Sequence, residues 1–259
     1  MSKHRIGLLF LILALLSTFR IAPAQAQSGG WSEPYRLSSE DGSASEGYLV
    51  ADQYGYVHCF WTEALSESQR NVIKYARFDG STWTKPNDIY VTGLELRNIS
   101  PFVDQHGMLY IAWAEGQSGS TYYHYMYTYA PAINALSAQS WAPPLQTVLP
   151  ARTAYMRVDT EGIFHILYID QTEEAGVYYM RSSDMGATWS EPVWLDPDIP
   201  PDHIPDSLNF ELDDQNGLHA VWWYGGLNRA RPDWVRYIHS LDGGGTWSAP
   251  FTLDQYNEE

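Results

Sequence analysis

Short segments in which apolar and polar residues alternate recur along this 259-residue chain, and Gly, Pro, Asp and Asn separate them. The apolar positions are rich in aromatic and β-branched side chains, which pack well on the pleated surface of a β-sheet. We find no segment in which apolar residues keep a helical period between capping residues. The pattern predicts an all-β fold.

One of these segments occurs four times. Each copy predicts a short strand, an Asp-x-x-Gly turn and a second strand that ends in aromatic residues. The copies read VADQYGYVHCFW (50–61), FVDQHGMLYIAW (102–113), RVDTEGIFHILY (157–168) and ELDDQNGLHAVWW (211–223). Asp52, Asp104 and Asp159 begin the first three turns, and we assign Asp214 to the fourth with a small change of register before His219.

A second repeated segment follows each of the first. It reads SSDMGATWSEPVWL (182–195) and SLDGGGTWSAPFTL (240–253), with reduced versions at 77–91 and 137–149 and an isolated tail, GGWSEPYRL, at 29–37. Each unit then predicts four strands, and four-stranded sheets repeated at about 50 residues are typical of β-propeller blades. We predict a β-propeller with four complete blades and an orphan N-terminal outer strand in the segment WSEPYRL.

The second repeat resembles the Asp-box of the sialidase (neuraminidase) superfamily, a β-propeller family. The matching residues are Ser182, Asp184, Gly186, Thr188 and Trp189, and again Ser240, Asp242, Gly244, Thr246 and Trp247. We interpret both as structural turns, in which the Asp accepts backbone N–H groups, glycine allows left-handed angles and the Trp packs between blades. A calcium loop is the alternative, but it needs six or more oxygen ligands, which this spacing does not supply.

The resemblance also implies a type of chemistry. Sialidases of this superfamily clamp a substrate carboxylate with three arginines, attack the sugar with a Tyr/Glu pair and use an Asp as acid/base. Six blades are usual, and the first arginine normally lies in an Arg-Ile-Pro segment. The similar string here, Arg20-Ile21-Ala22-Pro23, lies in a predicted leader, and we find no clear counterpart of the Tyr/Glu pair.

Alternate strands of a blade run in opposite directions, so both kinds of turn lie on one face of the propeller. The loops of the opposite face differ among the repeats, and we expect function there. The candidate catalytic residues are Asp170, as an acid/base, and Glu115. The candidate substrate-binding residues are Arg97, Arg152, Arg229 and Arg231, of which Arg97 and Arg152 best suit a carboxylate clamp. A solvated charged rim is the alternative.

Three histidines occupy equivalent strand positions, His58, His165 and His219, and Tyr110 replaces them in the second repeat. Repetition at one position of a repeat favours packing over metal binding. We predict no metal and no cofactor.

The N-terminus predicts an exported protein. Lys3, His4 and Arg5 precede an apolar run and a small-residue site, which is typical of a signal peptide at 1–26, followed by one propeller at 27–259. An uncleaved anchor is the alternative, although the run of 14 residues (6–19) is short for a membrane span of about 20. The single cysteine, Cys59, allows no internal disulfide.

Charge excludes some partners. Residues 1–26 hold three basic and no acidic residues, so the remainder carries 12 basic and 31 acidic residues, a net charge of −19. Such a surface repels nucleic acids and anionic membranes. We expect a secreted or periplasmic protein that binds a glycan or another extracellular ligand. The alternatives are an exo-α-sialidase or related glycoside hydrolase, and a scaffold for protein interactions.

The strand count leaves two interpretations of the chain itself. It either forms the N-terminal part of a longer propeller, about two blades short of the six usual in the family, or closes as a small propeller. We favour the first, because an unpaired outer strand edge beside an open stack of blades is an aggregation hazard.

Overall fold

The computed structural model describes residues 33–66, 68–120, 123–149, 153–170, 175–199, 203–226 and 234–255. The chain divides into two units, residues 1–36 and 37–259, and every described strand belongs to the second. The predicted signal peptide lies outside the described residues. Within the described ranges, no helix is long and apolar enough to cross a membrane.

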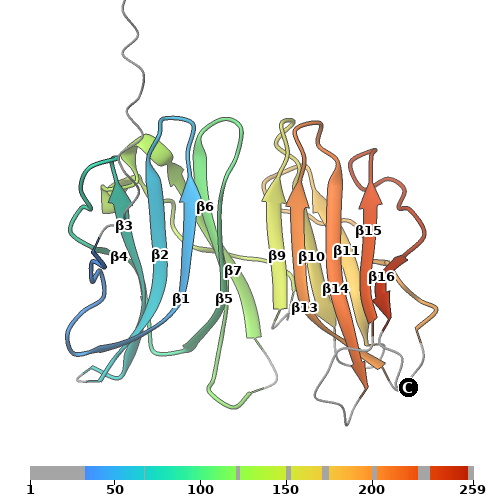
Figure 1. Cartoon of the computed structure of the whole chain (residues 1–259), viewed down its shortest axis with the longest axis horizontal. Helices are drawn as coiled ribbons and strands as arrows, with labels where there is room; N and C mark the ends of the chain where they lie inside the picture. Colours follow the sequence, from blue (N-terminus) through green and yellow to red (C-terminus); the bar gives the residue numbers. More distant parts are fainter. Residues whose placement is uncertain are drawn as a thin grey trace, which may run out of the picture. The chain divides into compact units, whose positions relative to one another are not determined.

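The described strands form four four-stranded antiparallel sheets (Figure 1), which confirms the predicted all-β architecture. Each sheet pairs its strands in chain order. The first holds β1 (Gly42–Ala51), β2 (Val57–Leu65), β3 (Arg70–Phe78) and β4 (Asn87–Thr92), and the second holds β5 (Glu95–Val103), β6 (Met108–Gly116), β7 (Tyr123–Pro131) and β8 (Leu145–Gln146). The third holds β9 (Thr153–Val158), β10 (Phe164–Asp170), β11 (Gly176–Ser182) and β12 (Val193–Trp194), and the fourth holds β13 (His203–Leu212), β14 (Leu218–Gly226), β15 (Trp234–Ser240) and β16 (Phe251–Gln255).

Two short 3₁₀ helices, η1 (Ala132–Asn134) and η2 (Ala138–Ser140), replace the Ser-x-Asp turn in the second sheet. The predicted outer strand near the N-terminus is not borne out in its described part, because residues 33–37 carry no strand. A strand requires a hydrogen-bonded neighbour, and each described sheet already contains four strands of its own.

Apolar clusters fill the space between successive sheets. Side chains alternate between the two faces of a strand, so neighbours in β10 serve different clusters. Phe164 and Ile166 pack with the second sheet, whereas Leu167 packs with the fourth. A third cluster joins the first two sheets through Phe60, Tyr75 and Trp113. The first strands β1, β5, β9 and β13 also contact one another in succession. This stacking is the arrangement of propeller blades.

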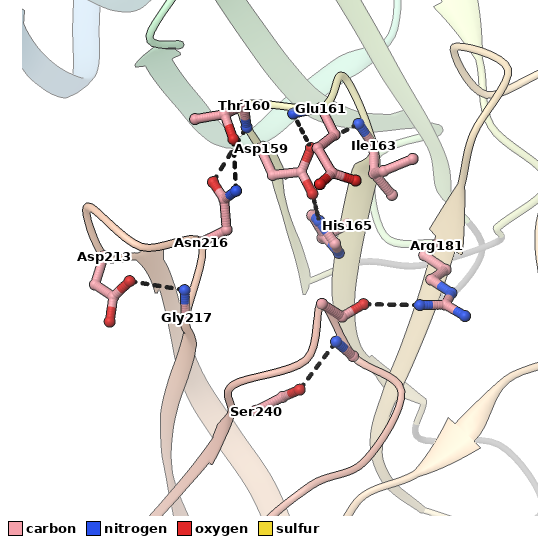
Figure 2. A network of polar contacts seen from close by, with 12 residues as sticks. Asp159, Thr160, Glu161, Ile163, His165, Arg181, Asp213, Asn216, Gly217 and Ser240 are labelled. Carbon is pink, nitrogen blue, oxygen red and sulfur yellow. Dashed lines mark hydrogen bonds and ion pairs between the residues drawn. The ribbon is translucent and has the colours of Figure 1, made fainter.

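A hydrogen-bonded triad holds the turn between the first two strands of the third sheet, and Figure 2 shows two of its members, Asp159 and His165. Asp159 Oδ1 accepts the N–H groups of Glu161 and Ile163 at 2.9 and 2.8 Å. Asp159 Oδ2 lies 3.2 Å from His165 Nε2, and His165 Nδ1 lies 2.8 Å from the Tyr179 hydroxyl. We call this unit, a carboxylate, an imidazole and a phenol, the turn triad.

Two other sheets repeat the turn triad, with the same spacing of six residues from the aspartate to the histidine. The residues are Asp52, His58 and Tyr75 in the first sheet, and Asp213, His219 and Tyr237 in the fourth. In the second sheet the Tyr110 hydroxyl takes the place of the imidazole and lies 3.4 Å from Asp104 Oδ2. The repeated histidines thus have a common structural task.

The assignment of Asp214 to the fourth turn was wrong. Asp213 accepts the N–H groups of Gln215 and Gly217 and meets His219, six residues on, as Asp159 meets His165. Asn216 takes the left-handed position with φ 64°, where Gly162 has φ 79° in the third turn. Asparagine tolerates this conformation better than other side chains, so the fourth turn keeps its register without glycine there.

Burial keeps two of the histidines neutral. It lowers the pKa of His58 and of His165, and it outweighs the carboxylates beside them, which favour the charged form. A neutral ring can donate from Nε2 to the carboxylate and accept at Nδ1 from the phenol. Burial also raises the pKa of Tyr75 and Tyr179, so both phenols remain protonated donors.

We expect the free energy of unfolding to fall as the pH falls from 7 to 5. A histidine that stays neutral in the folded state takes up its proton after unfolding, so the unfolded chain binds more protons below the ordinary histidine pKa of about 6.5. Each such residue contributes a slope of up to about 1.4 kcal/mol per pH unit. His165→Gln should be less stable at pH 7 and should show a shallower slope in urea unfolding.

His58→Gln changes the other histidine whose pKa burial lowers, and it should show the same shallower slope. Equal slopes in His165→Gln and wild type would contradict the neutral buried imidazole.

Candidate functional site

The face opposite the turn triads is described in part. Of the six predicted catalytic and substrate-binding residues, Arg152, Arg229 and Arg231 lie outside the described residues. Arg97, Glu115 and Asp170 are described, and they occupy different environments.

Arg97 in β5 belongs to a compact polar group. Its Nη2 lies 2.5 Å from Glu95 Oε1, and its Nε donates to the Tyr123 hydroxyl at 3.2 Å. The Tyr123 hydroxyl in turn donates to Glu95 Oε2 at 2.8 Å. Glu95 pairs with Gly116, which pairs with Tyr123 on its other side. Because glycine has no side chain, nothing from the middle strand separates the carboxylate from the phenol.

Exposure differs within this Arg97 group. The side chains of Arg97 and Glu95 are 36% and 27% exposed, whereas Tyr123 is 1% exposed. The group therefore offers solvent a guanidinium and a carboxylate, with the phenol beneath them.

Glu115 lies in the interior. It is buried and accepts a long hydrogen bond of 3.5 Å from the Trp113 indole. The pKa of Tyr90 in β4 is raised to about 12 by burial and by a hydrogen bond to Glu115, so Glu115 joins the first two sheets. In the first sheet Glu63 is buried in the same way and accepts from the Trp61 indole at 2.7 Å. This repetition favours a structural role for Glu115.

Asp170 is the last residue of β10 and is partly exposed. Burial raises the pKa of Tyr168 to about 12, and the charge of Asp170 adds to the increase. Asp170 thus lies near Tyr168 at the loop end of its strand, where it remains a candidate acid/base.

The first strands bring together a second polar group, which we call the inner-strand cluster. It consists of Glu46 and Tyr48 in β1, Tyr155 and Arg157 in β9, and Glu211 in β13. Arg157 donates from Nε to Glu211 Oε2 at 2.9 Å and from Nη2 to Glu211 Oε1, which is a bidentate pair. Its Nη1 donates to Ser100 Oγ in β5 at 3.2 Å, so all four first strands take part.

The two phenols of the inner-strand cluster are held in their protonated form. Burial raises the pKa of Tyr155, with Arg157 opposing and the charges of Glu46 and Glu211 adding to the rise. Burial also raises the pKa of Tyr48, with contributions from Tyr155 and Glu46. Tyr48 nevertheless remains 39% exposed. These phenols suit hydrogen-bond donation rather than nucleophilic attack.

Bulges in the first strands position these groups. Glu46, Asn98 and Ser207 adopt left-handed backbone angles of 53°, 50° and 46° where the pairing register shifts. Glu46 Oε2 accepts the N–H of Ile99 in the next sheet at 3.0 Å. Asn98 Nδ2 donates to Thr153 Oγ1 at 3.4 Å in the sheet after that. Each non-glycine residue in this region costs about 1 kcal/mol or more, which is common near functional sites.

Arg97 was predicted from the sequence, whereas the other members of the Arg97 group and of the inner-strand cluster were not. Glu95 and Arg97 are two residues apart in a strand and so share a side, which was a usable signal. Tyr123 contacts Glu95, and Arg157 pairs with Glu211, across strands far apart in the sequence. No local sequence pattern predicts such contacts.

The two predicted Ser-x-Asp turns connect the third and fourth strands of their sheets. Asp184 Oδ1 accepts the Ser182 hydroxyl and the Thr188 N–H, each at 2.8 Å, and Asp184 Oδ2 accepts the Thr188 hydroxyl. The Gly186 N–H donates to Ser182 Oγ and the Trp189 indole to the Gly186 carbonyl. Ser240, Asp242, Gly244 and Thr246 repeat the bonds among Ser, Asp, Gly and Thr, but not the indole bond.

These turns also dock onto the preceding sheet. The Tyr127 hydroxyl donates to the Met185 carbonyl at 2.6 Å, and the Tyr179 hydroxyl oxygen lies 3.2 Å from the Gly243 carbonyl. The Trp247 ring packs edge-on against Tyr179 at 5.0 Å. The pKa values of Asp184 and Asp242 are lowered to about 2 by bonds from Thr188 and Thr246, so both stay ionised at neutral pH.

Among the described residues, no group of three or more His, Cys, Asp or Glu side chains is placed to hold a metal ion.

Comparison with known proteins defines the fold class. No protein-family model matches the chain, and no curated protein matches it in sequence. A protein of unknown function from Dyadobacter fermentans is similar in structure, with 15% identity and a TM-score of 0.60 over 83% of this chain and 70% of that one. The similarity supports the assignment of the fold as a β-propeller.

Two carbohydrate-active proteins share the fold. One is a PL25 ulvan lyase bound to -[GlcA(1-4)Rha3S]-, with 13% identity and a TM-score of 0.55 over 79% of this chain and 54% of that one. The other is the α-L-arabinanase of Penicillium chrysogenum complexed with arabinobiose, with 14% identity and a TM-score of 0.55 over 78% of this chain and 65% of that one. This chain therefore spans about half to two thirds of the length of these two proteins.

Because the turn of the fourth sheet packs against Tyr179, alanine at two adjacent glycines should lower the free energy of unfolding by different amounts. A Cβ on Gly244 would clash with the Tyr179 hydroxyl, whereas a Cβ on Gly243 would meet nothing within 4 Å. Both have left-handed backbone angles, of 80° and 64°. Gly243→Ala should therefore lose only about 1–2 kcal/mol of unfolding free energy from backbone strain.

Gly244→Ala should lose about 1–3 kcal/mol more, because Tyr179 must move out of its packed position. Urea unfolding of both variants measures the difference. Equal losses would show that Tyr179 does not hold this turn.

Proposed function

We propose that this chain is an exported, carbohydrate-binding β-propeller whose ligand site includes the inner-strand cluster. The observation that carries the proposal is the placement of the partly exposed Tyr48 and of Tyr155 beside Glu46, Arg157 and Glu211. Tyrosine rings stack on apolar sugar faces, while fixed carboxylates and guanidinium groups hydrogen-bond sugar hydroxyls.

Two further observations support the proposal. The ulvan lyase and the arabinanase with the same fold were solved with oligosaccharides bound. Their sequence identity to this chain is too low to assign residue roles from them. Export rests on the signal-peptide pattern of residues 1–26. Burial raises the pKa of the Cys59 thiol to about 11, which keeps it protonated and poorly reactive in an oxidising compartment.

An exo-sialidase type of glycoside hydrolase is the second candidate. The Tyr123 hydroxyl touches both Glu95 and Arg97, which is the kind of Tyr, Glu and Arg set that the sialidase resemblance implies. Tyr123 is 1% exposed, however, and a nucleophile must reach its substrate. We therefore rank binding first.

A glycan array of neutral, uronate-containing and sialylated oligosaccharides tests the proposal, with calorimetric titration of whichever glycan is retained. Tyr48→Ala should weaken binding by about tenfold, the value of one lost aromatic stack of about 1.4 kcal/mol. Tyr54→Ala is the matched control, since it removes a tyrosine that is 53% exposed on the turn face and should leave the affinity unchanged. Retention of no glycan, or equal losses in both variants, would contradict the proposal.

The same preparations distinguish the second candidate. Release of fluorophore from a fluorogenic sialoside by wild type, lost in Tyr123→Phe, would favour the hydrolase. No release, together with glycan retention, would favour the binding protein.

A further inference from the structure

A cavity of about 500 Å³ lies on the turn face, between the third and fourth sheets. Its volume falls within the range of about 300–1,000 Å³ that is typical of small-ligand sites. Figure 2 shows the Asp159 turn, Arg181 and the turn that begins at Ser240, which border it. Its lining includes Glu161, Ile163, Arg181, Ser183, Trp189 and Asp242. We call it the turn-face pocket.

Part of the lining is a rigid frame. The Asp159 carboxylate accepts hydrogen bonds from the Glu161 and Ile163 N–H groups and contacts His165 Nε2. The Asp242 carboxylate is used by the N–H and hydroxyl of Thr246 and by the Ser240 hydroxyl. These groups hold the walls in place and have little capacity left for a ligand.

Other groups of the lining still have hydrogen-bond donors or acceptors available to a ligand. Arg181 Nη1 donates to the Gly243 carbonyl at 2.9 Å, and its remaining guanidinium N–H groups have no partner among the described residues. The Glu161 carboxylate and the Ser183 hydroxyl likewise have no hydrogen bond to any described residue, and both are exposed. The Trp189 indole N–H donates to the Gly186 carbonyl, so Trp189 and Ile163 offer only apolar surface to a ligand.

Comparison with the first sheet shows why Arg181 is available. Arg77 is its counterpart there, because Arg77 pairs with His58 as Arg181 pairs with His165. The Arg77 guanidinium lies 4.1 Å from the centre of the Tyr56 ring, which stacks on it. Ile163 occupies the place of Tyr56 in the third turn, four residues after the aspartate. The smaller residue removes the stacking partner and leaves space beside the guanidinium.

We propose that the turn-face pocket is a second ligand site, and that it binds a small sugar carboxylate. Arg181 would receive the carboxylate, Glu161 and Ser183 would hydrogen-bond ring hydroxyls, and Trp189 with Ile163 would contact the apolar ring face. A neutral sugar has no carboxylate to pair with Arg181. A simple carboxylate such as acetate has no ring to contact Trp189 and Ile163. This site is separate from the inner-strand cluster and does not depend on it.

Titration of the full chain with sodium glucuronate, glucose and acetate, followed by calorimetry or ligand-observed NMR, tests the proposal. Glucuronate should bind at least about tenfold more tightly than either of the other two. Arg181→Gln should lose about tenfold or more in glucuronate affinity, and it changes an exposed side chain, so folding is retained. Ile163→Tyr should abolish binding by restoring the stacked arrangement of the first sheet.

Two controls make the result specific. Arg77→Gln removes the equivalent arginine of the first sheet and should leave glucuronate affinity unchanged. Tyr48→Ala should also leave it unchanged, which separates this site from the inner-strand cluster. No binding of glucuronate at tens of millimolar, equal affinity in Arg181→Gln, or loss in Tyr48→Ala would overturn the proposal.

Discussion

The structure depends on one interaction, the aspartate carboxylate that closes the turn between the first two strands of each sheet. One oxygen accepts two backbone N–H groups, and the other meets a side chain six residues on. In three sheets that side chain is a histidine, which carries the contact to a tyrosine of the third strand. A single carboxylate therefore fixes the relation of three strands, and its repetition gives the sheets a common geometry.

This common geometry explains how different sites can arise on one scaffold. The tyrosine of the turn triad in the third sheet also holds the next sheet, because the Tyr179 hydroxyl reaches the Gly243 carbonyl. Within such a fixed frame, exchange of one residue changes the local chemistry and leaves the fold intact. Tyr56 covers Arg77 in the first sheet, whereas Ile163 leaves Arg181 open in the third. The first strands vary in the same way, through bulges at Glu46, Asn98 and Ser207.

The sheets were predictable from the sequence because alternation and aspartate–glycine turns are local signals. Where two local solutions existed the prediction was wrong: Asp213 and Asp214 both fit the fourth turn, and contact with His219 decides between them. The strand expected before residue 38 had the right local pattern but has no described neighbour in a sheet. Arg157 and Glu211 could not be paired in advance, since their meeting depends on which first strands adjoin.

Hydrogen exchange of the Ile163 amide tests the central role of the turn aspartate most directly. This N–H donates to Asp159 Oδ1 at 2.8 Å, although it lies at a turn where an amide would otherwise exchange rapidly. We expect Ile163 to exchange as slowly as amides inside β10, and Asp159→Ala to accelerate exchange at Ile163 and across β11. Rapid exchange at Ile163 in the unaltered chain, or acceleration confined to the turn, would contradict it.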